Sequence, residues 1–102
     1  MKQVVVRYKV KTDQAQENIS YIQAVFAALD ENKPAGLQYA SFQLEDNLTF
    51  VHVARINTAD GSNPLPQFDE FKAFSKDIAD RCDEKPVAMA ADTVGNFGLL
   101  SD

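Results

Sequence analysis

The chain has one cysteine, one histidine and no tryptophan among its 102 residues. A lone thiol, Cys82, excludes an internal disulfide and suits a reducing compartment, so we expect a cytoplasmic protein. Long apolar runs are also missing. Arg7 and Lys9 interrupt the first valines, whereas a secretory leader needs about 7–15 apolar residues. No window approaches the roughly 18 apolar residues of a membrane span, so we expect neither a leader nor a membrane partner.

Basic residues are in deficit, with 10 Lys and Arg against 15 Asp and Glu, which gives a formal net charge of −5. This balance argues against a nucleic-acid partner, because binding to phosphates normally needs a basic face. Apolar types make up 45% of the chain, which is too many for a disordered protein. The length fits one domain, spanning 1–102, with room for a single core.

Six segments carry the periodic patterns of secondary structure. Apolar residues that alternate with polar ones indicate a strand, and apolar residues at steps of three and four indicate a helix. In chain order the patterns predict a strand at 2–11, a helix at 13–31, strands at 37–44 and 48–56, a helix at 67–83 and a strand from 87 to about 100. Asp13 is the expected N-cap of the first helix, and Pro34 with Gly36 ends it. Gly95 and Gly98 predict a bulge or bend in the last strand.

The order β-α-β-β-α-β predicts the ferredoxin-like class of α+β fold, with one antiparallel sheet and both helices on one face. Right-handed crossovers place the first and third strands in the centre of the sheet. The third strand can face either way: Val51 and Val53 contact the helices, or Phe50, Ala54 and Ile56 do. We expect the two valines to face the helices, because the neighbouring central strand gives Val4, Val6, Tyr8 and Val10 to that face.

With that choice, one sheet face stays uncovered and mostly apolar. The expected face carries Val5, Arg7, Leu37, Tyr39, Phe50, His52 and Met89. An apolar patch of this kind usually marks an interface. A second copy of the chain is the economical partner, because a twofold dimer buries the same patch twice.

Several short motifs resemble a known group of proteins. They are Gly36-Leu37-Gln38-Tyr39, Thr49-Phe50-Val51-His52, Asn63-Pro64-Leu65 followed by Phe68, Arg81-Cys82, and the terminal Val94-Gly95-Asn96-Phe97. With the element order, they resemble the antibiotic biosynthesis monooxygenase-like families of the dimeric α/β-barrel superfamily, including its uncharacterised bacterial members.

The resemblance implies a homodimer whose two sheets form a barrel with the helices outside. Relatives use a cavity in this assembly for small aromatic or polyketide-like molecules. Some oxidise them without metal or flavin and others isomerise them, so we expect no cofactor. Haem-degrading members use an Asn, His and Trp set, and a chain without tryptophan does not inherit that activity.

His52 is the candidate catalytic residue. An imidazole titrates at about pH 6.5 and can act as a general base at neutral pH. Because His52 lies among valines in a predicted strand, a structural histidine in a dimer core is the other interpretation. A single histidine with no adjacent cysteine or carboxylate pair does not make a metal site, so we predict none.

Arg7, Tyr39 and Phe50 are the expected ligand-binding residues on the same face. A guanidinium buried there needs a ligand anion or a carboxylate, such as Glu45 or an acid of the partner chain. The Tyr39 hydroxyl would orient a phenolic or quinone ligand, or its ring would simply pack. Cys82 has no base nearby and is expected to be a core thiol of the second helix.

Two function classes follow. In the first, the protein is a cofactor-independent monooxygenase or isomerase, whose base takes a proton from a phenol or enol so that the carbanion reacts directly with oxygen. In the second, it is a non-catalytic dimeric module that binds a small ligand or assembles, since the sequence has no paired acid and base. The RNA-recognition fold shares the topology, but its Lys/Arg-Gly-Phe pattern is absent from 48–52 and the net charge opposes it.

Overall fold

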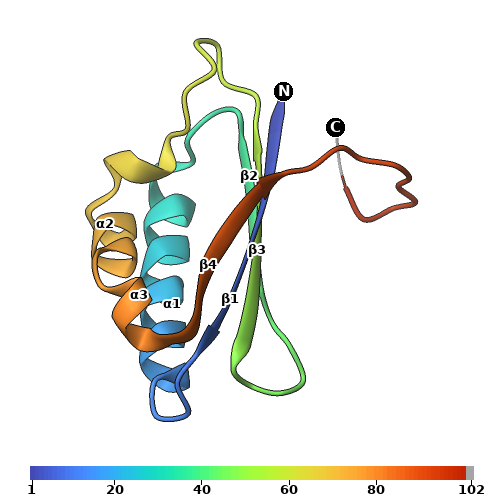
Figure 1. Ribbon diagram of the computed structural model, residues 1–102. Helices are drawn as coiled ribbons and strands as arrows, with labels where there is room; N and C mark the ends of the chain where they lie inside the picture. Colours follow the sequence, from blue (N-terminus) through green and yellow to red (C-terminus); the bar gives the residue numbers. More distant parts are fainter. Residues whose placement is uncertain (101–102) are drawn as a thin grey trace.

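The computed structural model describes residues 1–100 and consists of a four-stranded sheet with helices packed on one face (Figure 1). Its elements are β1 (Lys2–Val10), α1 (Ala15–Asn32), β2 (Leu37–Gln43), β3 (Thr49–Ile56), the 3-10 turn η1 (Leu65–Gln67), α2 (Asp69–Lys76), α3 (Ile78–Arg81) and β4 (Cys82–Ala90). The strand order is β2-β3-β1-β4 and every pairing is antiparallel. The predicted ferredoxin-like fold and its two central strands are confirmed.

The second half of the chain departs from the predicted boundaries. The predicted helix at 67–83 is divided into α2 and α3 at Asp77, and Cys82 begins β4 instead of lying on a helix. The last strand ends at Ala90, so Gly95 and Gly98 lie beyond it. The irregularity in the sheet is instead a register shift around Lys9, where β1 pairs with β4. Asp13 is not the cap of α1, because Gln14 holds that position without a side-chain hydrogen bond.

The face of β3 was predicted wrongly. Tyr8 lies opposite Phe50 and Val6 lies opposite His52 in the β1–β3 pairing. Directly opposed residues of an antiparallel pair project from the same face of the sheet. Tyr8, Phe50 and His52 are only 1%, 1% and 3% exposed, so this is the face that the helices cover.

The same shift of one residue changes the face of β2. Tyr39 lies opposite Ala54 and Ser41 opposite His52, so both point toward the helices. Because side chains alternate along a strand, a wrong choice at one residue transfers every residue of the strand to the other face. The expected grouping of Leu37, Tyr39, Phe50 and His52 on the uncovered face is therefore wrong.

The uncovered face remains substantially apolar with its corrected membership. Its apolar members are Val5, Ala40, Phe42, Val51, Val53, Val87 and Met89, and the polar residues on the same face include Gln3, Arg7, Gln38 and Arg55. Phe42 and Met89 are 49% and 67% exposed. Arg7, predicted to be trapped in an interface, forms an ion pair with Glu84 at 3.0 Å in which both side chains are half exposed.

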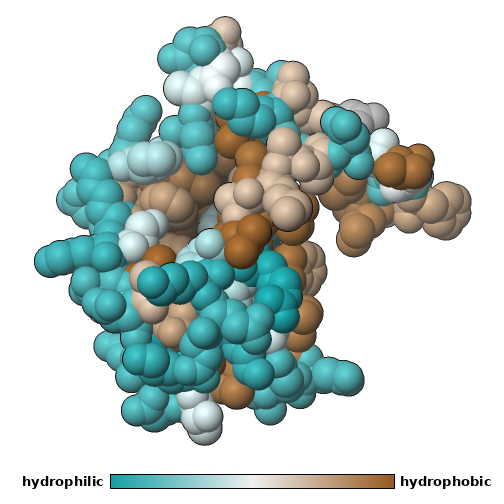
Figure 2. All heavy atoms as spheres, in the orientation of Figure 1, coloured by the Kyte–Doolittle hydropathy of each residue, from teal (hydrophilic) through white to brown (hydrophobic). Residues whose placement is uncertain are grey.

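Residues 91–100 form an irregular tail after β4 that extends away from the sheet (Figure 1). Leu99 and Leu100 border a groove on the uncovered face with Phe42 and Val53. Figure 2 shows apolar side chains gathered on this tail, at the upper right of the view. Phe97 is fully exposed there. None of the helices within residues 1–100 is long and apolar enough to cross a bilayer.

Gly36 is the one glycine whose surroundings exclude a side chain. It has φ +80°, and a Cβ there would lie 2.6 Å from the backbone oxygen of Asn57. Its own carbonyl accepts a hydrogen bond from the Asn57 N–H at 2.7 Å, which ties the start of β2 to the end of β3. Gly61 has a similar φ of +78°, but a Cβ there would have no atom within 4 Å. A substitution at Gly61 therefore measures the cost of the backbone conformation without a steric clash.

We expect Gly36→Ala to lower the free energy of unfolding more than Gly61→Ala does. Both variants place a side chain in the left-handed region at a cost of about 1–2 kcal/mol. Gly36→Ala also forces the backbones of β2 and β3 apart, which costs roughly 1–3 kcal/mol more. Urea unfolding of the three proteins measures the difference. Equal losses in the two variants would show that the close approach at Gly36 is unimportant.

Candidate functional site

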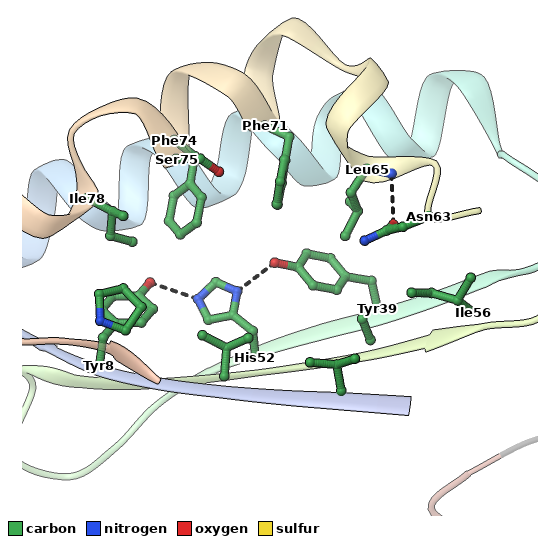
Figure 3. Close-up of a pocket in the computed structure, with 14 residues that line it drawn as sticks. Tyr8, Tyr39, His52, Ile56, Asn63, Leu65, Phe71, Phe74, Ser75 and Ile78 are labelled. Carbon is green, nitrogen blue, oxygen red and sulfur yellow. Dashed lines mark hydrogen bonds between the residues drawn. The ribbon is translucent and has the colours of Figure 1, made fainter. Parts of the chain in front are cut away.

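A cavity of about 230 Å³ lies between the covered face of the sheet and α2 (Figure 3). Its wall is mainly apolar, and the polar side chains that interrupt it are Tyr8, Tyr39, His52, Asn63 and Ser75. A cavity of about 150 Å³ admits benzene, and drug-sized ligands occupy about 300 Å³ or more. The space therefore suits a molecule of one or two fused rings.

His52 is at the centre of a buried hydrogen-bond network on the sheet side of this cavity (Figure 3). Its Nε2 lies 2.7 Å from the Tyr8 hydroxyl, and its Nδ1 lies 2.7 Å from the Tyr39 hydroxyl. The Ser41 hydroxyl lies 2.9 Å from the same Nδ1. Both ring nitrogens thus have protein partners, and His52 lines the cavity together with Tyr8 and Tyr39.

The strand pairing explains why these residues meet. His52 stands on central strand β3, opposite Ser41 on β2. Tyr8 follows two residues after Val6, which pairs with His52 on β1. Diagonal neighbours on one face of a sheet are close enough for aromatic side chains to touch, and the Tyr8 and His52 ring centroids are 5.3 Å apart.

The network continues from Tyr8 into the helices. The Asn18 side chain of α1 is fully buried and donates from Nδ2 to the Tyr8 hydroxyl at 2.9 Å. Arg81, at the end of α3, donates from Nη2 to Asn18 Oδ1 at 3.2 Å and to the Phe74 carbonyl at 2.8 Å. The Arg81 guanidinium also lies over the Tyr21 ring, 4.6 Å from its centroid. Such contacts compensate a cation taken out of water.

Burial controls the protonation of the three aromatic groups. Desolvation lowers the pKa of His52 from 6.5 to about 4, because the charged imidazolium is disfavoured away from water. Desolvation raises the pKa of Tyr39 to about 12, and it raises the pKa of Tyr8 well above its usual value despite the Asn18 hydrogen bond. In the resting protein all three groups are therefore neutral at physiological pH.

Asn63 faces the cavity from the loop before η1. Its Oδ1 accepts a hydrogen bond from the Leu65 N–H at 3.0 Å, which holds the amide in place. The Nδ2 end is directed toward the cavity in Figure 3. Phe71 and Phe74 form the helical side of the same space. The arrangement offers a mainly apolar cavity with hydrogen-bonding groups toward both ends.

Of the predicted site residues, the structure brings His52 and Tyr39 together and separates the others. Arg7 projects from the opposite face of the sheet, so the prediction that it shares a pocket with His52 is wrong. Phe50 is on the covered face, but it stacks on Tyr8 with centroids 5.6 Å apart and does not line the cavity.

The sequence analysis missed Tyr8, Ser41, Asn18 and Arg81 as members of the site. Tyr8 was assigned correctly to the covered face but only as a core residue. Had Phe50 been placed on that face, the alternation would have put Tyr8 and His52 side by side. Asn18 gave a weaker signal, as a polar residue next to Ile19 in the apolar stripe of the first helix.

No cluster of three His, Cys, Asp or Glu side chains that could hold a metal ion occurs within residues 1–100. The groups that border the cavity are phenols, an imidazole, a hydroxyl and an amide. They can donate and accept hydrogen bonds and can pass a proton between neighbours. Their chemistry suits a small neutral aromatic molecule that carries oxygen substituents.

No protein-family model and no curated protein matches the chain. Solved structures do match. A crystal structure of an antibiotic biosynthesis monooxygenase is similar with a TM-score of 0.74 at 14% identity, over 93% of this chain and 100% of that one. A protein from Caulobacter crescentus named for the same family has a TM-score of 0.72 at 21% identity, over 92% of this chain and 90% of the other.

SnoaB, a cofactor-independent oxygenase from Streptomyces nogalater, is also similar in its N63A mutant. Its TM-score is 0.67 at 14% identity, over 95% of this chain and 96% of SnoaB. At these identities the likeness concerns the fold. The resemblance to antibiotic biosynthesis monooxygenase-like proteins that the sequence indicated is confirmed at that level.

The buried neutral His52 should make stability depend on pH. Its pKa is 6.5 in the unfolded chain and about 4 in the folded one, so below pH 6.5 the unfolded state binds more protons. The stabilisation is complete above the unfolded pKa and is lost as pH falls toward the folded one. Between about pH 7.5 and about pH 5 we expect the free energy of unfolding to fall by about 2 kcal/mol from this group.

The measurement is urea unfolding at the two pH values, for the natural chain and for His52→Gln. The variant keeps a neutral hydrogen-bonding side chain but cannot be protonated, so its stability should change by about 2 kcal/mol less. The carboxyl of Asp46, whose pKa is lowered to about 2, titrates below this range in both proteins. An unchanged pH dependence in His52→Gln would contradict the assignment.

Proposed function

We propose that the protein is a small-molecule cavity enzyme of the cofactor-independent oxygenase type, acting on phenolic, quinol or polyketide-like aromatic compounds. The observation that carries the proposal is the hydrogen-bonded trio of Tyr8, His52 and Tyr39 on one wall of an otherwise apolar cavity. The fold that the chain shares with SnoaB supports it. Arg7 and Phe50 have no part in this site.

The trio divides acid and base roles between its two phenols. A bound phenol gives its proton to the Tyr8 oxygen while the Tyr8 proton passes to His52 Nε2, over the 2.7 Å that separates them. The Tyr39 hydroxyl donates to the phenolate oxygen that develops. Protonating His52 alone is unfavourable, but here the imidazolium forms beside an anion, and the two attract strongly in a poorly polar site.

The oxidation then proceeds at a ring carbon of the electron-rich phenolate. One oxygen atom of O2 bonds to that carbon, which loses its hydrogen, and the other oxygen leaves as water. The balance is one phenol and one O2 giving one quinone and one water, with the substrate oxidised by four electrons. The protein supplies orientation, exclusion of water and the first proton transfer.

A non-catalytic ligand-binding module is the second candidate function. It is favoured by the two ring nitrogens of His52, which are both occupied by protein groups, and by its lowered pKa. In that case the trio only recognises the oxygen substituents of a bound ring. Binding without oxygen uptake distinguishes this function from the oxygenase.

1-Naphthol is a suitable probe, since its two fused rings match the cavity and its oxidation to 1,4-naphthoquinone consumes one O2. We expect the protein to bind it and to form quinone and consume oxygen in equal amounts. Tyr8→Phe should lower turnover by at least about 100-fold, because it removes the proton path to His52.

Tyr21→Phe is the matched control, because its hydroxyl does not line the cavity and its ring, which contacts Arg81, is kept. Its turnover should equal that of the natural chain. Oxygen uptake that is the same in Tyr8→Phe would remove the proposed proton path. Binding with no uptake in any of the proteins would select the module, and absence of binding would overturn both functions.

We further propose that the uncovered face is the contact surface of a homodimer in the cytoplasm. Phe42, Val87 and Met89 are all about half exposed or more on this face, and the tail after β4 adds the exposed Phe97. Patches of this kind are rarely left in water by monomers. The single cysteine, Cys82, is free, which suits a reducing compartment.

Light scattering should report a particle of twice the chain mass. The double variant Phe42→Lys with Met89→Lys should halve that mass, because two ammonium groups in each copy would be buried in an apolar contact. The control is Ala73→Lys with Ala79→Lys, which adds the same charge at exposed positions of the helical layer. A monomeric natural chain, or an undiminished dimer in the first variant, would overturn this proposal.

A further inference from the structure

A chain of hydrogen bonds runs from Arg81 through Asn18 and Tyr8 to His52. From it we infer that Arg81 and Asn18 are positioning residues that fix the tautomer of His52, with its proton on Nδ1. Asn18 is fully buried and neither residue lines the cavity. Their effect on the site is exerted through the direction in which each hydrogen bond points.

Arg81 sets the direction because a guanidinium donates hydrogen bonds and never accepts them. Its Nη2 and Nε lie 3.2 and 3.4 Å from one atom of the Asn18 amide, so that atom must be the oxygen Oδ1. The Phe74 carbonyl, 2.8 Å from Nη2, and the Tyr21 ring hold the guanidinium in place. The Asn18 amide therefore cannot rotate to exchange its oxygen and nitrogen.

The direction is transmitted to Tyr8 and then to His52. With Oδ1 toward Arg81, Asn18 presents its NH2 group to the Tyr8 oxygen at 2.9 Å. The Tyr8 oxygen accepts that bond, and its own proton is directed to the acceptor 2.7 Å away, which is His52 Nε2. Nε2 must then be unprotonated, and a neutral imidazole carries its single proton on the other nitrogen.

The cavity side of the site follows from this tautomer. The Nδ1 proton is donated to the Tyr39 hydroxyl, which at 2.7 Å is nearer than the Ser41 hydroxyl at 2.9 Å. Tyr39 accepts from the imidazole, so its own proton is available to a molecule in the cavity. The resting site thus offers an O–H donor at Tyr39 and an unprotonated Nε2 behind Tyr8.

The test is the tautomer itself, and it needs no substrate. The chain has one histidine, so in a 15N-labelled sample its two ring nitrogens give a single pair of signals. At about pH 8 the ring is neutral, and the protonated and unprotonated nitrogens have widely separated 15N shifts. We expect Nδ1 to carry the proton in the natural chain, and a proton on Nε2 would overturn the inference.

Asn18→Asp should exchange the two signals. The new carboxylate accepts from Arg81 and can only accept from Tyr8, so the Tyr8 proton turns toward it. The Tyr8 oxygen must then accept from His52 Nε2–H, which leaves Nδ1 unprotonated. Asn32→Asp makes the same chemical change on the same helix at an exposed residue, so it should leave the tautomer as in the natural chain.

Two variants of Arg81 separate its role from that of general packing. Arg81→Lys keeps a group that only donates and should keep the Nδ1 proton. Arg81→Met frees the amide, so the two 15N signals should move toward each other as the tautomers mix. If the two 15N signals of His52 are unchanged in Arg81→Met, or in folded Asn18→Asp, the positioning role of that residue is overturned. This outcome does not depend on whether the protein oxidises 1-naphthol.

Discussion

The structure depends on a buried imidazole whose two nitrogens must both be satisfied by protein groups. His52 is 3% exposed between the sheet and the helices, and a polar group in such a place costs several kcal/mol without hydrogen bonds. The phenols of Tyr8 and Tyr39 meet that requirement from the strands on either side. The buried Tyr8 hydroxyl in turn accepts a hydrogen bond from the Asn18 amide, and the Asn18 oxygen accepts one from Arg81. The hydrogen-bond network that begins at His52 thus joins five secondary-structure elements, β1, β2, β3, α1 and α3.

The order of the elements could be predicted from the sequence, and the face of β3 could not. Periodicity alone identified the strands and the helices, because it depends only on which residues repeat. The face of β3 depends on which of two apolar sets packs better, and both sets are suitable in polarity. The larger set that includes Phe50 and Ile56 fills the space under the helices, whereas Val51 and Val53 lie on the open side. The side-chain size of the two sets therefore accounts for the face of β3 better than the expected packing of valine against valine.

The wrong face for β3 also made the predicted grouping of site residues wrong. It placed His52 and Tyr39 on the uncovered face with Arg7, although the first two lie beneath the helices and the third pairs with Glu84 in water. The right residue types were identified, but their neighbours were wrong. Asn18 and Arg81 belong to elements 63 residues apart in the sequence, and no local pattern reports their contact. Long-range hydrogen bonds of this kind become visible only when the packing of helices on the sheet is known.

The covered location also changes what His52 can do. On an open face, an imidazole with an ordinary pKa would act as a base by itself. Beneath the helices its pKa falls to about 4, and its two nitrogens are occupied, so any proton reaches it only through a neighbouring phenol. An anion formed beside His52 would favour its protonated form, because opposite charges attract strongly in a poorly polar site. For the proposed function, this means that the apolar cavity would favour proton transfer from a bound ring that can delocalise the charge.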